Sequence, residues 1–128
     1  MIFLITLIFF IATVDLKLSP EVIVDWENFH IPHFDECVKE TNVDPMVARL
    51  MLRQLHLPDE NEFHCYLKCI YQRNQLLTSD ESDLNYDQLV NFIHLSPELV
   101  DKCIKVAKSE VEICRKTYIF VKCFLEVD

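Results

Sequence analysis

Two of the six cysteines, Cys65 and Cys69, lie four residues apart in the stretch FHCYLKC, and this spacing constrains the fold more than any other feature. The stretch reads as an amphipathic helix. Four helical steps place the second cysteine roughly 40° from the first around the axis, one turn further along. Both thiols therefore face the same neighbouring surface. They either bind something jointly, such as a metal, or tie this helix to two other segments of the chain.

The first 18 residues are expected to be a signal peptide. Residues 2–14 contain no charged side chain, and a run of this length is typical of a signal-peptide core but too short to cross a bilayer comfortably. We expect cleavage between residues 12 and 19, which leaves residues 19–128 as one secreted, extracellular domain. The alternative is a buried N-terminal helix or strand. No second apolar run approaches the length of a membrane span, so stable membrane insertion is not expected.

Charge and cysteine content narrow the class of protein further. The net charge of −9 argues against binding to nucleic acid or to anionic membrane surfaces. An even number of cysteines in a small secreted chain is most simply a set of three disulfides. The chain has no glycine, which disfavours tight β-hairpins and leaves helix interiors unaffected.

Helix start signals recur along the chain and predict an all-α fold. SPEV at 19–22, DPMV at 44–47 and SPEL at 96–99 each place a capping side chain before a proline, a combination that favours a helix N-terminus. DENE at 59–62, NYDQ at 85–88 and SEVE at 109–112 resemble capping boxes. Six starts predict six helices, at residues 20–40 (disturbed by Pro32), 45–56, 60–75, 86–94, 97–108 and 110–125.

Helix geometry limits which cysteines can pair. Cys114 and Cys123 are nine residues apart on one predicted helix, about 13.5 Å along its axis, which exceeds the reach of a disulfide. Cys65 and Cys69 share a face, but their side chains run parallel rather than converging. Excluding both local pairs leaves about ten of the fifteen possible connectivities. Each of them ties the central helix to two other segments.

A metal site is the weaker explanation of the cysteines. Four zinc ligands usually arrive as two close pairs joined by a short loop, and His64 projects about 100° away from Cys65 on the helix. His30 and His33, in the stretch HIPH, have a spacing that suits a metal, but surface histidines are far commoner. We predict no metal and no cofactor.

The order of the cysteines resembles the six-cysteine pattern of insect odorant-binding proteins, which include the pheromone-binding proteins. The gaps between successive cysteines are 27, 3, 33, 10 and 8 residues, and the gaps of three and eight match that pattern. FDEC before Cys37 is similar to the first helix of the family. The resemblance implies six helices around a closed apolar cavity that carries small hydrophobic molecules. It also implies the disulfides Cys37–Cys69, Cys65–Cys114 and Cys103–Cys123.

The chain departs from the family pattern in three places. The gap before Cys103 is at the short end. The turn after the third helix, where the family often has glycine, reads RNQLL, so Asn74 is the expected position of a positive φ. Only five residues follow Cys123, so the long insertable tail of moth pheromone carriers is missing.

The resemblance and the helical periodicity together indicate a set of cavity-wall residues. By position in the family pattern, Leu67, Tyr71, Leu76, Phe120 and Phe124 are expected to line the cavity. Periodicity adds a second group more loosely, and ordinary core packing is the alternative for every member of both groups. The Tyr71 phenol is of particular interest because it can donate a hydrogen bond to a ligand oxygen. The second group consists of Met51, Leu55, Leu89, Phe92 and Ile93.

Enzymatic readings find little support. Without glycine the chain has no Gly-x-Ser-x-Gly elbow, no phosphate-binding loop and no glycine-built calcium loop. The five histidines either act as a pH switch for ligand release or are ordinary surface residues. Lys102, Lys105 and Lys108 form a stripe that is either a solvated face or a patch that faces a receptor.

The function that these features favour is a secreted, non-enzymatic carrier of small apolar organic molecules. The resemblance implies odorant or pheromone ligands and delivery to a chemosensory receptor, by a monomer or a weak dimer. A carrier in a non-olfactory secretion fits the same features. The competing class is a secreted helical signalling or membrane-interacting protein, in which a solid core replaces the cavity.

Overall fold

The computed structural model describes residues 19–92 and 94–125, which form an all-α fold as expected. The proposed signal peptide at residues 1–18 lies outside the described part. No described helix is long and apolar enough to cross a membrane. The helices are α2 (Pro20–His30), the 3-10 helix η1 (Ile31–His33), α3 (Phe34–Thr41), α4 (Pro45–Gln54), α5 (Asn61–Arg73), α6 (Tyr86–Leu89), α7 (Pro97–Ala107) and α8 (Ile113–Leu125).

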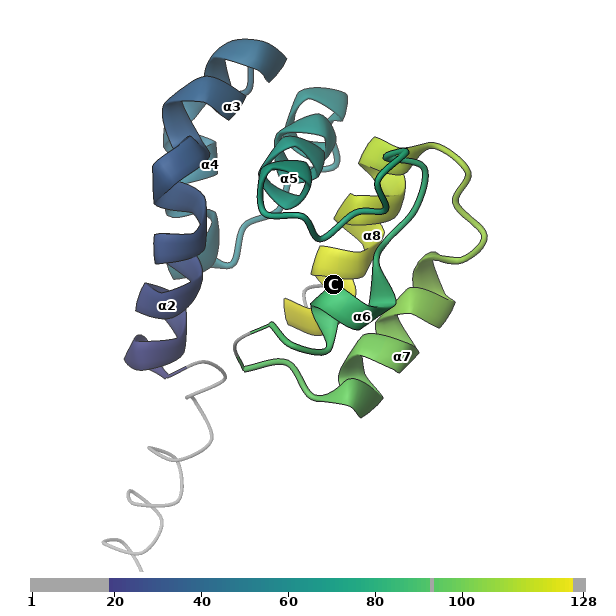
Figure 1. Cartoon of the computed structure of the whole chain (residues 1–128). Coiled ribbons are helices and arrows are strands. Elements are labelled where there is room, and N and C mark those ends of the chain that lie inside the picture. The colour runs from purple at the N-terminus through teal and green to yellow at the C-terminus, as the bar shows by residue number, and fades with distance from the viewer. Residues whose placement is uncertain (1–18, 93, 126–128) are drawn as a thin grey trace, which may run out of the picture.

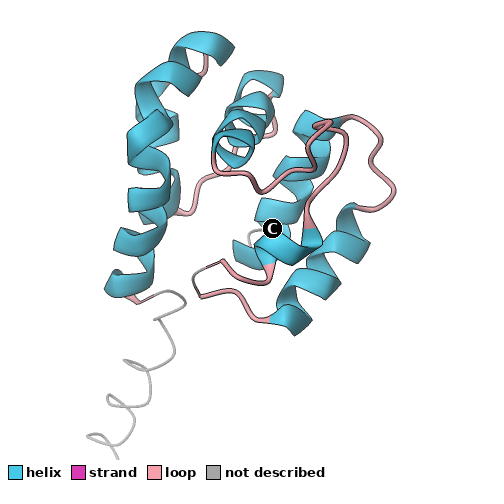
Figure 2. Cartoon of the chain, in the orientation of Figure 1, coloured by secondary structure: helices cyan, strands magenta, loops and turns pink. Residues whose placement is uncertain are grey.

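Helix α5 occupies the centre of the bundle (Figure 1). The rod formed by α2, η1 and α3 runs along one side of it together with α4, and α8 lies on the other side with α6 and α7 beyond. Figure 2 shows that the long connections, before and after α6 and between α7 and α8, are loops. The loop after α6 reaches α2, where His94 Nε2 lies 2.8 Å from Asp25 and Phe92 packs against Phe29. The most deeply buried residues of α5, among them Phe63, Tyr66, Leu67 and Ile70, have no exposed surface.

Four of the predicted helix starts carry the expected cap. The side chains of Ser19, Asp44, Asn85 and Ser96 each accept a hydrogen bond from a backbone N–H in the first helical turn. These caps satisfy amides that have no partner within the helix. Proline follows three of them at the first helical position.

The first predicted helix, residues 20–40, is divided in two at the proline. Pro32 lies within η1, which separates α2 from α3. Proline cannot donate the backbone hydrogen bond that a continuous helix requires, and its ring crowds the preceding turn. The tighter 3-10 turn accommodates it and leaves the two helices in line as a bent rod.

Three of the expected boundaries are wrong because side chains have other partners. Helix α6 ends at Leu89, well short of residue 94, and Phe92 packs against Phe29 instead, with ring centroids 4.6 Å apart. Helix α8 starts at Ile113 rather than 110, where Glu112 accepts from the backbone N–H groups of Cys114 and Arg115. Asp59 does not cap α5, whose N-cap is Glu60.

The three disulfides join four helices in series. Cys37–Cys69 links α3 to α5, Cys65–Cys114 links α5 to α8, and Cys103–Cys123 links α8 to α7. These are the pairs that the family resemblance implies. The two cysteines of the central helix are therefore bonded to two different neighbouring helices, which is the second of the two explanations offered for their spacing.

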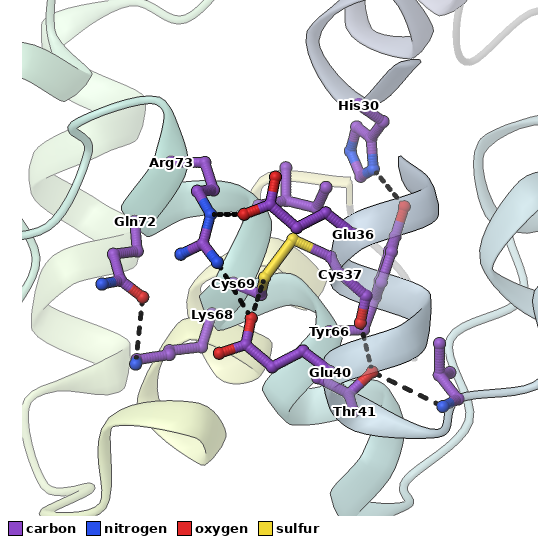
Figure 3. The surroundings of a disulfide bond; sticks show 12 residues. His30, Glu36, Cys37, Glu40, Thr41, Tyr66, Lys68, Cys69, Gln72 and Arg73 are labelled. Atoms are coloured by element: carbon purple, nitrogen blue, oxygen red, sulfur yellow. Dashed lines mark hydrogen bonds and ion pairs between the residues drawn. A yellow bond between two sulfur atoms is a disulfide. The ribbon is translucent and has the colours of Figure 1, made fainter. Parts of the chain in front are cut away.

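Charged side chains surround the Cys37–Cys69 disulfide (Figure 3). Arg73 on α5 donates to Glu36 at 2.7 Å and to Glu40 at 3.2 Å, and both acceptors belong to α3. The guanidinium thus adds two ion pairs to the covalent link between the same two helices. Ion pairs at this degree of exposure contribute little to stability compared with the disulfide.

The expectation that Asn74 takes a positive φ is wrong. Asn74 has φ −100°, and its side-chain amide donates to the carbonyl oxygens of Ile70 and Phe29. The next residue, Gln75, adopts φ 63°. The Asn74 amide is therefore used to close α5 and to anchor the end of α2, and the left-handed turn falls on its neighbour.

Gln75→Gly is expected to stabilise the protein by about 1 kcal/mol, because a side chain in the left-handed region is strained and glycine is not. Gln75 is exposed, so the change removes little packing. Urea unfolding of the oxidised protein measures the effect. The matched control is Gln72→Gly, inside α5, which should destabilise by a similar amount. Destabilisation by both changes would contradict the strain at Gln75.

Candidate ligand-binding site

An inner cavity lies between α2, α4, α5 and α8, next to the segment that follows α6. Its walls are almost entirely apolar or aromatic. The side chains come from five parts of the chain that only the folded bundle brings together. They are Trp26, Phe29, His30, Met51, Leu52, Leu67, Tyr71, Phe92, Val121 and Phe124.

The aromatic rings of this wall contact one another edge to face. Phe29 packs against both Tyr71 and Phe92, with centroid distances of 5.9 and 4.6 Å, and Trp26 packs against Phe124 at 5.2 Å. Edge-to-face pairs hold rings in defined orientations. The wall therefore contains two groups of packed rings, and it offers a ligand shape and dispersion contacts with few hydrogen bonds.

Tyr71 carries the one hydroxyl of this wall. The other two buried tyrosines have partners: the Tyr66 hydroxyl lies 3.0 Å from His30 Nδ1, and Tyr118 donates to the Leu57 carbonyl oxygen at 3.1 Å. Among the described residues, Tyr71 makes no such bond. Its burial raises the pKa of the phenol, so the group remains a neutral O–H donor at physiological pH.

Half of the expected wall residues line this cavity. Met51, Leu67, Tyr71, Phe92 and Phe124 do. The others lie elsewhere. Leu76, Leu89 and Phe120 are buried in the surrounding core. Leu55 caps the end of α4, and Ile93 is outside the described residues.

Leu55 is not among the residues that line the inner cavity, and it terminates α4. It adopts φ 47° and ψ 44° at the C-cap of α4, and its backbone N–H bonds to the Met51 carbonyl oxygen. The helical periodicity that placed it beside Met51 does not extend to a left-handed residue. Leu76 follows α5 outside the helix, and its backbone likewise bonds to the Tyr71 carbonyl oxygen.

The residues that sequence reasoning missed come mostly from α2. Trp26, Phe29 and His30 have the i, i+3, i+4 spacing of a single helical face, and this signal was available in the sequence. Leu52 and Val121 are neighbours of buried residues on helices where several faces are apolar. Periodicity does not separate them from ordinary core.

The inner cavity is small as it stands, and a larger cavity lies beside it. The inner space has a volume of about 10 Å³, against about 400 Å³ for the outer cavity. The outer cavity is formed by α2, η1, α3, α4 and α5, and its walls include the polar or charged residues Glu27, Asp35, Arg49 and Tyr66. His30, Met51 and Leu52 belong to the walls of both.

His30 and Tyr66 form a hydrogen-bonded pair at the boundary of the two cavities (Figure 3). His30 ends α2, and Tyr66 projects from α5. Desolvation by the surrounding protein lowers the pKa of His30 to about 4, and burial raises the pKa of Tyr66. Both groups are therefore neutral between pH 5 and pH 8, and the pair is a neutral hydrogen bond.

The described residues offer no ligand set that suits a metal ion. Three potential ligand atoms meet in two places, and each group consists of one disulfide and one glutamate: Cys37, Cys69 and Glu40, and Cys65, Cys114 and Glu112. Metal binding by cysteine requires a thiolate, which a disulfide does not provide. His30 and His33 are not part of either group.

Comparison with known proteins agrees with the cysteine pattern and the fold. No curated protein matches the sequence. Among solved structures, odorant binding protein 5 of Apis mellifera is similar, with a TM-score of 0.59 and 20% identity over 85% of this chain and 91% of that one. At this identity the likeness shows the fold. The profile of the PBP/GOBP family matches residues 30–127, and the chain therefore belongs to the PBP/GOBP family.

Proposed function

We propose that this protein is a secreted carrier of small apolar organic molecules, of the odorant or pheromone type, and that the inner cavity is where it holds them. Membership of the PBP/GOBP family supports a binding rather than an enzymatic role. The observation that carries the proposal is the aromatic wall with one hydroxyl, that of Tyr71, to which no described residue is hydrogen-bonded. Ligand pockets typically combine such apolar walls with a few polar groups that orient the ligand.

Binding requires the inner cavity to expand. Its volume of about 10 Å³ is close to the room that one water needs, whereas ligand pockets span about 300–1,000 Å³. Phe29 and Phe92 are only partly buried, and Met51 has a flexible side chain. Outward movement of these three side chains opens the wall without a change of the disulfide-linked framework.

A ligand of about 15 heavy atoms at roughly 0.4 kcal/mol each gives a binding free energy of about −6 kcal/mol, which corresponds to a dissociation constant in the tens of micromolar. Displacement of a fluorescent apolar probe by a panel of volatile compounds tests this. Trp26 provides a second readout, because it is the single tryptophan and it lines the inner cavity. Ligands that displace the probe should also change the tryptophan fluorescence.

A secreted signalling or membrane-interacting protein with a solid core is the second candidate, and the small volume of the inner cavity favours it. The same experiment separates the two. A solid core predicts that correctly oxidised protein binds no probe and that its tryptophan emission is unaffected by any volatile compound. Probe binding with a coupled change at Trp26 rejects the solid core.

Tyr71→Phe is expected to weaken binding of compact oxygen-bearing ligands about fivefold, because one hydrogen bond in an apolar site is worth about 1 kcal/mol. Binding of the hydrocarbon with the same carbon skeleton should not change. Tyr118→Phe is the matched control. The Tyr118 hydroxyl donates to the Leu57 carbonyl oxygen, and Tyr118 lines neither cavity. Equal losses for alcohol and hydrocarbon would contradict the role of the hydroxyl.

Delivery to a chemosensory receptor and the monomeric or weakly dimeric state remain part of the proposal. The stripe of Lys102, Lys105 and Lys108 stays the candidate receptor-facing patch. All three side chains are exposed on α7 or directly after it. Lys105 forms an exposed ion pair with Asp101 at 2.9 Å, and pairs of this kind exchange readily with other partners.

A further inference from the structure

We propose that the outer cavity is a second compartment of the binding site, which takes the neutral, oxygen-bearing end of an elongated ligand whose apolar part lies in the inner cavity. This rests on the proposed carrier function and adds to it a ligand class and a polar recognition group. The recognition group is the imidazole of His30, at the boundary between the two compartments.

The outer cavity lies directly beside the inner cavity. The two spaces adjoin each other, because the side chains of His30, Met51 and Leu52 belong to both walls. Met51 can change shape at low cost. His30 ends α2 where the chain turns into η1. Side-chain rotation at these positions joins a space of about 10 Å³ to one of about 400 Å³, and the sum is within the range of ligand pockets.

An apolar surface leads into the outer cavity. Ala48, Met51 and Leu52 of α4 are buried and form an apolar part of its wall. Ile31, also part of the wall, is 64% exposed. The apolar part of the wall therefore extends to the surface of the protein at Ile31. An apolar chain can therefore pass from the surface along α4 to the inner cavity.

His30 has unused hydrogen-bonding capacity. Its Nδ1 lies 3.0 Å from the Tyr66 hydroxyl, and the described residues provide its Nε2 with no partner. If Tyr66 donates to Nδ1, then Nε2 carries the proton and donates to a carbonyl oxygen. If Nδ1 donates to Tyr66, then Nε2 accepts from a hydroxyl group. Either arrangement recognises an alcohol, aldehyde or ester.

The charges of the outer cavity favour a neutral end group over an ion. Glu27 already accepts hydrogen bonds from Nε and Nη2 of Arg53, at 2.8 Å each. The remaining charges of the wall, those of Asp35 and Arg49, have opposite sign, and the Arg49 guanidinium lies 4.9 Å from the Phe34 ring centroid. His30 is neutral above pH 5, since its pKa is about 4. No net charge is left to attract a carboxylate or an ammonium group.

The test uses straight-chain alcohols of increasing length, each with the hydrocarbon of equal length, in the probe-displacement assay on the oxidised protein. In the wild type, each added methylene should improve affinity up to about fourfold until both compartments are filled. Ala48→Phe fills the outer compartment, so the improvement should stop at shorter chains and the longest alcohols should bind at least tenfold more weakly. Compact ligands should bind as before.

His30→Phe keeps a ring of similar size and removes both nitrogen atoms. It should abolish the preference for long-chain alcohols over hydrocarbons, which means a loss of about fivefold in affinity for these alcohols. The affinity for compact alcohols should not change, because Tyr71 bonds to their oxygen. His33→Phe, three residues further along, is the matched control because His33 lines neither cavity. Tyr71→Phe should show the reverse pattern, with its loss confined to compact alcohols.

If Ala48→Phe does not fold, the Ala48 methyl resonance of the wild type replaces it as a probe of the outer cavity. That resonance should shift on titration with long-chain alcohols and not with compact ones. An unchanged chain-length profile in Ala48→Phe, an Ala48 methyl that never shifts, or an alcohol preference that survives in His30→Phe overturns the second compartment. Each of these leaves the carrier function intact as long as the wild type displaces the probe. A wild type that binds no ligand overturns both.

Discussion

Reduction of the three disulfides should unfold this protein at room temperature. Their sequence separations are 32, 49 and 20 residues, and by the chain-entropy model loops of these lengths contribute about 3–4 kcal/mol each. Domains of this size have a total stability of about 5–15 kcal/mol. Loss of all three should therefore remove most or all of it. Far-UV circular dichroism with and without reductant measures the change, and a cooperative transition that survives reduction would contradict it.

Removal of one disulfide at a time shows how much each contributes to stability. Cys65→Ser with Cys114→Ser opens the largest loop and separates α5 from α8, which should destabilise the protein by about 4 kcal/mol. Cys103→Ser with Cys123→Ser opens the smallest loop and serves as the comparison, with a loss of about 3 kcal/mol. A smaller loss for the α5–α8 link would show that residual contacts between these two segments already restrain the unfolded chain.

The features of the fold that sequence reasoning predicted are those encoded within a few residues. A serine or aspartate before a proline defines a helix start locally, and Ser19, Asp44 and Ser96 all cap helices. The i, i+4 spacing of Cys65 and Cys69 is equally local, because it needs only the helical repeat. The pairing partners of these two cysteines did not follow from geometry, which left about ten connectivities; they came from the family resemblance.

The features that it did not predict depend on contacts between distant residues. Asp59 was expected to cap α5, yet its carboxylate lies 3.0 Å from Arg115 on α8 and 2.9 Å from His64. An ion pair between residues 56 positions apart has no local signature. Phe92 was expected to lie in a helix, but it lies beyond the end of α6 and packs against the ring of Phe29, which is again a contact across the bundle. Tertiary contacts of this kind override helix propensity.

The candidate site shows the same division. Tyr71 was singled out because an aromatic residue with a polar tip on an amphipathic helix is visible in the sequence, and it does line the inner cavity. His30 was considered only as a metal ligand or a pH switch. Its place between two cavities follows from the packing of α2 against α4 and α5, and from the break at Pro32 that ends its helix. The break was expected from Pro32 itself, whereas the packing of α2 against α4 and α5 has no signature in the residues around His30.

Stability should fall as the pH is lowered from 6.5 toward 4, with His30 as a principal cause. Its pKa in the folded state is about 4 because the imidazole is desolvated, whereas its pKa in the unfolded chain is the ordinary 6.5. Between these values the unfolded state binds a proton that the folded state does not, so acid favours unfolding. The full difference corresponds to at most about 3 kcal/mol, complete near pH 4 and absent above neutrality.

Urea unfolding of the wild type and of His30→Phe at pH 7 and at pH 4.5 measures this contribution. The variant loses its hydrogen bond to Tyr66 at both pH values, so it can be less stable throughout, but the fall in stability between the two should be smaller than in the wild type by about 2.5 kcal/mol. His33→Phe retains His30 and should keep the wild-type dependence. Equal pH dependence in wild type and His30→Phe would mean that the imidazole is solvated in the folded state. The boundary between the two cavities would then be open to water at His30, and the neutral hydrogen bond to Tyr66 would not persist in solution.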